Sequence, residues 1–333
     1  MASINQIHRS LSKLKQKAPQ RTIDVSTEKW VIFSDHHRGI GDGADDFAPC
    51  KESYSLALKS YLEEDFGLIL LGDVEEFWEN TLSSVISKYR DVLNLEKEFH
   101  AKAKLVKIWG NHDDAWNHLS QVKKHLFPFF DNIRTYEALS CRAVINERTL
   151  GDILLVHGHQ GSSASDKFAG ISRWFVRVIW RNVQRLFNIP LSTPSVSKEL
   201  KDKHDIAMHT WASSEEKQIL ICGHTHQPVF MSRNHLDILE SELKSLNPKN
   251  ENDAKRIVAI NEKIAQLHSK TTAIGTLVSD QTPSYFNSGC CSFADGDITG
   301  LEIIEGDIKL VKWDKSKKTI IQSEKLEQLF EML

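Results

Sequence analysis

The stretch LVKIWGNHD at residues 105–113 joins a short apolar run to a polar turn that contains an asparagine, a histidine and an aspartate. Continuous apolar runs of this length are typical of strands that are buried on both faces, as in a sheet covered by helices. A polar turn directly after such a strand lies at the strand's carboxyl end, where α/β sheets bind their ligands. This stretch therefore indicates an α/β protein with a ligand site at one edge of its sheet.

The same pattern occurs at four other places in the chain. The apolar runs and the polar blocks that follow them are 30–33 with DHH at 35–37, 68–71 with GD at 72–73, 153–156 with HGH at 157–159, and 219–222 with GHTH at 223–226. Helical spacing of apolar residues lies between some of these runs, near 51–64 and 84–103. The alternation of strands and helices predicts the α/β class, with polar clusters at the strand ends.

Composition excludes several classes of protein. The 333 residues include 42 Lys plus Arg and 45 Asp plus Glu, a net charge of −3, which argues against a protein that coats nucleic acid. The basic, polar start and the absence of any apolar stretch near 18 residues argue against a signal peptide and a transmembrane helix. The five cysteines have no C-x-x-C spacing, which argues against a disulfide framework. We expect a cytoplasmic protein that does not bind nucleic acid.

The polar blocks have the chemistry of a metal site. They hold seven of the 15 histidines, and carboxylate, imidazole and amide groups bind Mn, Fe and Zn. Asp35 and His37 lie two residues apart at a strand end, as do His224 and His226, so each pair can bind one ion. One ion takes about four to six ligands, and the blocks supply more. Each block alone has an ordinary explanation as a turn or a capping pair, but all five together favour two ions.

The ordered blocks resemble those of the calcineurin-like metallophosphoesterases, which are D-x-H, G-D-x-x-D/E, G-N-H-D/E, H and G-H-x-H. The resemblance covers roughly residues 29 to 300. It implies a four-layer α/β/β/α sandwich of two mixed β-sheets flanked by helices. We expect one such domain over residues 1–333 with two helical insertions, an Arg/Trp-rich one at 160–216 that forms a lid and a helical hairpin at 232–282.

The resemblance also implies a role for each residue of the blocks. The first metal would be held by Asp35, His37, Asp73 and His226. Asp73 would bridge to a second metal, which is completed by Asn111, His157 and His224. His112 would be the acid that protonates the leaving oxygen, with Glu76 as the carboxylate that orients it, and His159 would contact a metal or the substrate. The cofactors would be two divalent ions, Mn²⁺ in the first place and Fe or Zn as alternatives.

Physical chemistry supports these roles. Two cations a few ångströms apart lower the pKa of a bridging water and supply hydroxide near neutral pH. The same cations neutralise phosphate oxygens, so in-line attack on phosphorus meets less repulsion. An imidazole that a carboxylate orients is a suitable general acid. We therefore predict a metal-dependent phosphoester hydrolase.

The first insertion is the best indication of the substrate. In 171–189 four arginines recur at every fourth residue without any acid, and three of them are the expected substrate contacts: Arg173, Arg177 and Arg181. One interpretation is a solvated arginine face on a helix packed against the core. The other is a basic, aromatic-rich helix that lies on anionic lipid or covers a lipid-bearing substrate. A weaker resemblance to UDP-2,3-diacylglucosamine pyrophosphohydrolases favours a phosphorylated small-molecule or lipid-linked nucleotide substrate, with peripheral contact at the inner face of a membrane.

Two other functions remain open. A phosphoprotein phosphatase or a phosphodiesterase or nuclease would use the same metal centre. A non-catalytic scaffold would use the fold for protein interaction, with the helical hairpin as its docking surface. A scaffold has no chemical need for the complete ligand set and His112, which argues against it.

Overall fold

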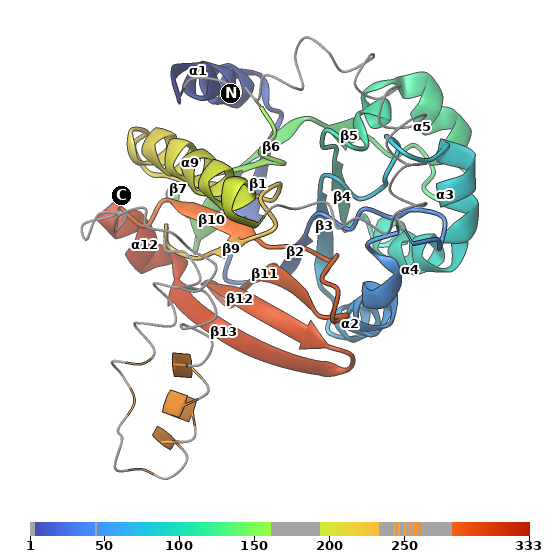
Figure 1. Cartoon of the computed structure of the whole chain (residues 1–333). Helices are drawn as coiled ribbons and strands as arrows, with labels where there is room; N and C mark the ends of the chain where they lie inside the picture. The colour runs from blue at the N-terminus through green and yellow to red at the C-terminus, as the bar shows by residue number, and fades with distance from the viewer. Residues whose placement is uncertain are drawn as a thin grey trace.

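The computed structural model describes residues 4–43, 45–160, 194–232 and 282–333, together with scattered positions between 243 and 261. Two β-sheets pack face to face, and helices cover the outer side of each sheet (Figure 1). One apolar cluster fills the space between the sheets, and one lies under each set of helices. The predicted four-layer α/β/β/α sandwich is therefore confirmed.

The first sheet has the strand order β1-β6-β7-β8-β10-β9 in the described residues. In that order its strands are Gln20–Asp24, Ala138–Ile145, Arg148–Val156, Gln218–Cys222, Tyr285–Ser288 and Pro228–Val229. β7, β8 and β10 are parallel, whereas β6 and β9 run antiparallel to their neighbours β7 and β10. Because β7 and β8 are parallel, the HGH and GHTH blocks that follow them emerge at the same edge of the sheet.

The second sheet has the order β13-β12-β11-β2-β3-β4-β5. In that order its strands are Lys317–Lys325, Asp307–Asp314, Ile298–Ile304, Trp30–Phe33, Gly67–Leu71, Leu105–Ile108 and Thr135–Tyr136. β2 to β5 are parallel, and β11 to β13 form an antiparallel meander. The blocks after β2, β3 and β4 therefore lie side by side.

Strand β2 shows why these runs are apolar throughout. Trp30 and Ile32 face the other sheet, while Val31 and Phe33 face the helices on the outside. Successive side chains of a strand point to opposite faces, so a strand between two apolar layers has no polar position. The interpretation of such runs as strands buried on both faces is confirmed.

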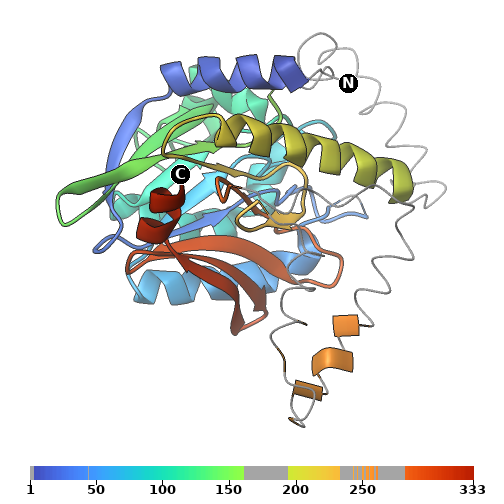
Figure 2. The same cartoon turned by 90° about the vertical axis from the view of Figure 1, so that its left-hand side faces the viewer.

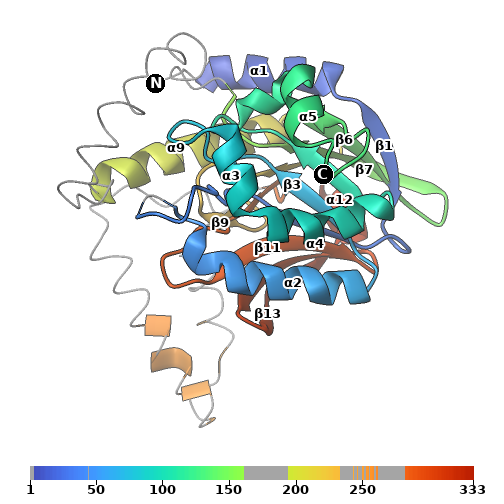
Figure 3. The same ribbon diagram turned by 90° about the vertical axis from the view of Figure 1, so that its right-hand side faces the viewer.

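The helices form the two outer layers. On the first sheet lie α1 (Ile4–Lys17) and α9 (Pro194–Ser213), side by side as Figure 2 shows. On the second sheet lie α2 (Lys51–Glu63) and α4 (Arg90–Ala101), with α3 (Leu82–Lys88) and α5 (Leu119–His125) beside them (Figure 3). The short 3-10 helices are Ala48–Cys50 and Asp114–Asn117, and α12 (Leu326–Met332) closes the core between the sheets. No helix in these described parts is long and apolar enough to cross a membrane.

Two sequence expectations need correction. The helix expected over 84–103 is divided into α3 and α4 at Tyr89, whose hydroxyl donates a hydrogen bond to Asp45 at 2.6 Å. The sequence also predicts a closing helix over 323–333, but α12 starts only at Leu326, because the residues before it extend β13 along β12. The partner of Tyr89 lies 44 residues earlier in the chain, whereas β13 is lengthened by pairing with the neighbouring strand of its own hairpin.

Parts of the two insertions lie outside the described residues. For the first, at 160–216, the structure describes Gln160 and α9 but not 161–193. For the second, at 232–282, it describes the two ends and scattered positions between 243 and 261. The expected helix at 171–189 and the expected helical hairpin therefore stay predictions.

Candidate metal centre

The five polar blocks meet where the carboxyl ends of the two sheets' parallel strands face each other. Backbone hydrogen bonds join the first two blocks, from the Asp35 amide to the Gly72 carbonyl at 3.0 Å and from the His37 amide to the Asp73 carbonyl at 3.0 Å. The two sheets are joined by the His224 amide, which donates to Asp35 Oδ2 at 2.9 Å. These bonds bring the blocks into one site.

Two glycines of the blocks permit this close approach. A Cβ atom at Gly110 would collide with Oδ1 of Asp73, and one at Gly223 would collide with Oδ2 of Asp35. The glycines in the G-N-H-D and G-H-x-H blocks are therefore required by packing against the carboxylates, since only glycine lets the backbone come so near.

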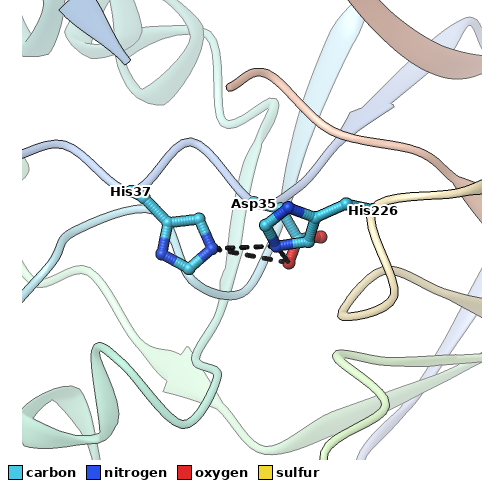
Figure 4. Close-up of side chains that lie close together, drawn as sticks. All are labelled: Asp35, His37 and His226. Atoms are coloured by element: carbon cyan, nitrogen blue, oxygen red, sulfur yellow. Dashed lines mark hydrogen bonds and ion pairs between the residues drawn. The ribbon is translucent and has the colours of Figure 1, made fainter. Parts of the chain in front are cut away.

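One group of ligand atoms is formed by Asp35, His37 and His226 (Figure 4). Nε2 of His37 and Nε2 of His226 lie 3.1 Å apart, and Oδ1 of Asp35 is 3.3 Å from the latter and 3.9 Å from the former. Two imidazole nitrogens and a carboxylate oxygen that converge in this way fit one divalent ion.

A second group is formed by Asp73, His157 and His224. Nε2 of His157 lies 2.9 Å from Oδ2 of Asp73, and its Nδ1 donates to the Leu71 carbonyl at 3.0 Å. A hydrogen bond at the far ring nitrogen is the usual way to hold a histidine ligand in orientation. This group fits a second ion.

Asp73 lies between the two groups. Its Oδ2 atom, 2.9 Å from His157 of the second group, is also 4.0 Å from Nε2 of His37 in the first group. Asp35 approaches the second group as well, with Oδ1 4.0 Å from Nε2 of His157. The two groups are thus adjacent, with the Asp73 carboxylate close to both, which is the arrangement expected of a two-metal site.

Buried polar atoms provide an independent test of the metal fit. Oδ1 of Asp35, Oδ1 of Asn111 and Nε2 of His157 are buried and form no hydrogen bond with the described residues, although Asp35 and His157 make the close charged contacts given above. Leaving a buried polar atom without a partner costs about 1–3 kcal/mol, and this cost applies to the Asn111 oxygen. All three atom types are metal ligands, so the residues present fit the ions.

His112 and Glu76 lie beside the first group. Oε2 of Glu76 accepts hydrogen bonds from Nδ1 of His112 at 2.6 Å and from Nδ1 of His37 at 3.1 Å. Burial alone raises the pKa of the Glu76 carboxyl, but the facing His112 and His37 lower it to about 2. The carboxylate is therefore charged at neutral pH, and it leaves Nε2 of His112 as the nitrogen for proton exchange with a substrate.

The family model described as calcineurin-like phosphoesterase matches residues 29–228, a range that includes all five blocks. The chain belongs to this family. The phosphoesterase is accordingly a hydrolase that acts on phosphoesters, as the motifs predicted.

Matches to solved structures were also found. A dimetal phosphatase from Danio rerio is 11% identical with a TM-score of 0.34, covering 89% of this chain and 99% of that one. A cold-active protein-tyrosine phosphatase of a psychrophilic Shewanella species is 11% identical with a TM-score of 0.33, covering 92% of this chain and 84% of that one. No curated protein matches the sequence.

The other sequence candidates are placed as follows. His159 is buried beside His157, with ring centroids 5.5 Å apart, but belongs to neither ligand group in the described residues. Burial and His157 lower the pKa of the His159 imidazole to about 3, so it is neutral. Outside the described residues lie the three expected substrate contacts, Arg173, Arg177 and Arg181.

Sequence reasoning missed Asp113. Its carboxylate accepts hydrogen bonds from the backbone amides of Gly110 at 2.6 Å, Val74 at 3.0 Å and Asp73 at 3.3 Å. Asp113 thereby connects the block after β3 with the block after β4. Burial raises its pKa to about 7, with Glu75 and Asp73 contributing in the same direction. The acid at the end of G-N-H-D was a signal for this role, because short acids commonly bind nearby backbone amides.

Helix α9 contacts both histidine loops of the first sheet, which the sequence did not indicate. His204 donates from Nε2 to the carbonyl of Gly158 at 2.7 Å. The next residue, Asp205, accepts hydrogen bonds from the hydroxyls of Tyr285 at 2.7 Å and Thr225 at 3.3 Å. Gly158 and Thr225 are the middle residues of the HGH and HTH segments, so α9 supports both.

The ligand residues adopt an unusual backbone conformation. Positive φ angles, between 50° and 72°, occur at five of the expected ligands: Asp35, His37, Asp73, His224 and His226. This left-handed region costs a residue other than glycine about 1 kcal/mol or more. The site of the phosphoesterase therefore stores backbone strain in order to aim its side chains.

We expect His226→Gly to stabilise the metal-free protein while weakening metal binding. Glycine adopts φ near 59° without strain, and the gain of about 1 kcal/mol corresponds to a rise of roughly 1–2 °C in Tm for a chain of this length. Thermal unfolding in EDTA measures it. His118→Gly is the control, because His118 is exposed and has φ of −99°, where glycine destabilises through the entropy of the unfolded chain. If His226→Gly and His118→Gly both had a lower Tm than the wild type, backbone strain at His226 would be refuted.

Metal loading should release protons. Burial disfavours the charged imidazoles, but Glu76, Asp73 and Asp35 raise the pKa of His37 to about 10, and the two aspartates raise that of His157 to about 9. Both are protonated at neutral pH without metal, and ligands must lose their protons.

Calorimetric titration of Mn²⁺ in buffers of different ionisation enthalpy should therefore show release of about two protons per chain near pH 7. Since folding raises both pKa values, these groups stabilise the metal-free protein below about pH 6.5, and the contribution is lost as pH rises toward 9 and 10. The Tm in EDTA should fall over that window. If no protons were released on metal binding near pH 7, the assignment of His37 and His157 as metal ligands that are protonated without metal would be contradicted.

Proposed function

We propose that the phosphoesterase binds two divalent metal ions, Mn²⁺ in the first place, and hydrolyses a phosphorylated small molecule or lipid-linked nucleotide. The proposal of two metal ions rests on the position of Asp73, whose carboxylate lies between two groups of ligand atoms. We assign Asp35, His37, Asp73 and His226 to the first ion, and Asp73, Asn111, His157 and His224 to the second. Mixed carboxylate, imidazole and amide donors suit Mn²⁺, with Fe and Zn as alternatives.

The protein's own residues position the reaction. Metal ions bound there would neutralise phosphate charge and activate water. Asp113 and the backbone bonds between the blocks hold the ligand loops rigid. His112 would give a proton from Nε2 to the leaving oxygen, and Glu76 at Nδ1 would hold the ring and stabilise its charged form.

The first insertion supports the proposal for a lipid-linked substrate. The described residues on its two sides are at the site: Gln160 directly follows His159, and α9 contacts the histidine loops through His204 and Asp205. The described parts of this insertion, Gln160 after the histidine loop and the α9 residues that contact both loops, support a role in covering a substrate. Its arginines at 173, 177 and 181 would then bind phosphate, in a substrate like UDP-2,3-diacylglucosamine or at an anionic membrane surface.

The test is a substrate screen of the purified protein loaded with Mn²⁺. Phosphomonoesters, phosphodiesters, nucleotide pyrophosphates with and without acyl chains, and phosphopeptides are compared, and we expect the highest kcat/KM for an acylated nucleotide pyrophosphate. Preference for phosphopeptides or nucleic acid would overturn the substrate class while leaving the metal centre intact. Hydrolysis of none, with two ions bound, would favour a scaffold.

Membrane contact has its own test. Sedimentation with vesicles that contain anionic phospholipid is compared for the wild type and for a variant in which Arg173, Arg177, Arg181 and Arg185 are replaced by glutamine. We expect the wild type to sediment and the variant to lose most of its binding. Equal sedimentation of the two proteins would overturn the membrane proposal.

A further inference from the structure

Trp78 lies against His112 and touches three parts of the site. Its indole ring stacks on the His112 imidazole, with centroids 4.1 Å apart and planes inclined by 17°. Its Nε1 donates a hydrogen bond to the carbonyl of Asn111 at 2.7 Å. Its own backbone amide donates to Oε1 of Glu76 at 3.0 Å. One residue thus connects the expected acid, an expected ligand and the carboxylate that faces the acid, the first two through its indole and the third through its backbone amide.

The contacts of His112 show what the indole adds. The hydrogen bond from Nδ1 to Glu76 fixes one atom of the ring but leaves the ring free to tilt about that bond. The edge-on contact with His37, at 4.7 Å and 86°, limits one direction of tilt. The parallel indole limits the remaining direction because it covers one face of the imidazole. With all three in place, the direction of Nε2 is determined.

The second anchor of Trp78 makes it a rigid support. A stacked indole can hold a neighbour in place only if it is held itself. The bond from Nε1 to the Asn111 carbonyl ties the indole to the residue directly before His112, while the backbone amide of Phe77 donates to the His112 carbonyl at 3.1 Å. The His112 ring, the His112 backbone and the Trp78 indole are therefore connected to one another by direct contacts.

We propose that Trp78 is the positioning residue that aims Nε2 of His112 at the leaving oxygen, an inference that rests on His112 being the acid. General acid catalysis requires the donor within hydrogen-bond reach of the accepting atom, and a misplacement of about 1 Å can cost up to about 100-fold in rate. The contribution of Trp78 depends on the substrate. A leaving group that departs readily as an anion needs no proton, so only poor leaving groups require the indole.

The experiment compares Trp78→Phe and Trp78→Leu with wild type on two esters, 4-nitrophenyl phosphate and benzyl phosphate, and on their methyl diesters. Phenylalanine keeps an aromatic face and lacks the N–H, whereas leucine lacks both. Trp211→Phe is the matched control, because Trp211 also donates from Nε1, to Ser12 at 2.9 Å on the far side of the first sheet. Bound metal is measured for every variant.

We expect Trp78→Leu to lower kcat for the benzyl ester about ten-fold or more, with KM, metal content and hydrolysis of the 4-nitrophenyl ester within about two-fold of wild type. Trp78→Phe should be intermediate and Trp211→Phe unchanged. In a His112→Ala background, Trp78→Leu should have no further effect, because a residue that acts through His112 is silent without it.

Two results would overturn the inference. One is an equal loss on both esters, and the other is an additive loss in the His112→Ala background. Failure of the proposed function would give different results. Either the wild type would hydrolyse none of the esters, or His112→Ala would hydrolyse the benzyl ester as fast as the wild type. A loss of metal in Trp78→Leu would show that Trp78 supports Asn111 and the metal instead of the acid.

Discussion

Asp73→Asn is expected to eliminate binding of both metal ions and to lower kcat/KM by about 10³-fold or more. Oδ2 of Asp73 lies next to both ligand groups, so its loss affects the two ions together. Oδ1 accepts the His112 amide at 2.8 Å, and in the variant the amide oxygen would keep this bond and turn the NH₂ group toward the metals. The partly positive NH₂ hydrogens of asparagine would then face the metal ions where the wild type has the negative carboxylate oxygen. Metal analysis after dialysis and steady-state kinetics measure both effects.

Asp65→Asn is a closely matched control for this change. Asp65 has φ of 64° and Asp73 has φ of 50°, so both are left-handed aspartates, and asparagine tolerates that conformation. Asp65 is exposed and pairs with Lys104 at 2.7 Å, remote from the ligand groups. We expect wild-type metal content and activity for Asp65→Asn. If Asp73→Asn retained two ions per chain, Asp73 would not be the bridging ligand.

His112→Ala is expected to keep both metals and to lose about 10²–10⁴-fold in kcat for a natural substrate with a poor leaving group. His112 belongs neither to the Asp35 group nor to the Asp73 group, and it approaches the first of them only through His37 and Glu76, so we expect both groups to bind their ions without its side chain. Its Nδ1 bond to Glu76 and its exposed edge suit proton transfer to a leaving oxygen. Activated aryl phosphates should be much less affected.

The kinetics should be measured with metal content determined in the same samples. His118→Ala serves as control, because His118 is exposed and lies six residues further along the chain. Glu76→Gln should fall between the wild type and His112→Ala, since the ring keeps a hydrogen-bond partner but loses the facing charge. Unchanged kinetics of His112→Ala on both activated and natural substrates would refute its role as acid.

The placement of the ligand residues could be predicted because each lies directly after a buried strand. In a parallel arrangement the carboxyl ends of neighbouring strands meet at one edge, so identifying the strands by their apolar runs was sufficient to bring Asp35, Asp73 and Asn111 together. That His157 and His224 face them from a second sheet was implied only by the family resemblance, and the structure has the two histidines at the ends of strands of that sheet. Local patterns were adequate here because strand and ligand are adjacent in the chain.

What could not be predicted depends on contacts between distant segments. Tyr89, where the expected helix is divided, donates its hydroxyl to Asp45, 44 residues earlier. His204 supports a loop 46 residues away, and the hydrophobic periodicity of its helix carries no information about that partner. Trp78 lies two residues after Glu76, yet its stacking on His112 became evident only from the arrangement in space. Such pairings are determined by the packing of the whole domain.

The left-handed backbone at Asp35, His37, Asp73, His224 and His226 has a consequence for the evolution of this chain. Branched residues such as valine, isoleucine and threonine are strongly disfavoured in that conformation, while glycine and asparagine are tolerated. A descendant that abandoned hydrolysis would be free of the chemical constraint but would still inherit the turn. Its ligands would then be replaced preferentially by glycine or asparagine, so those two residues at these positions would mark a lineage that has lost the enzyme and kept the fold.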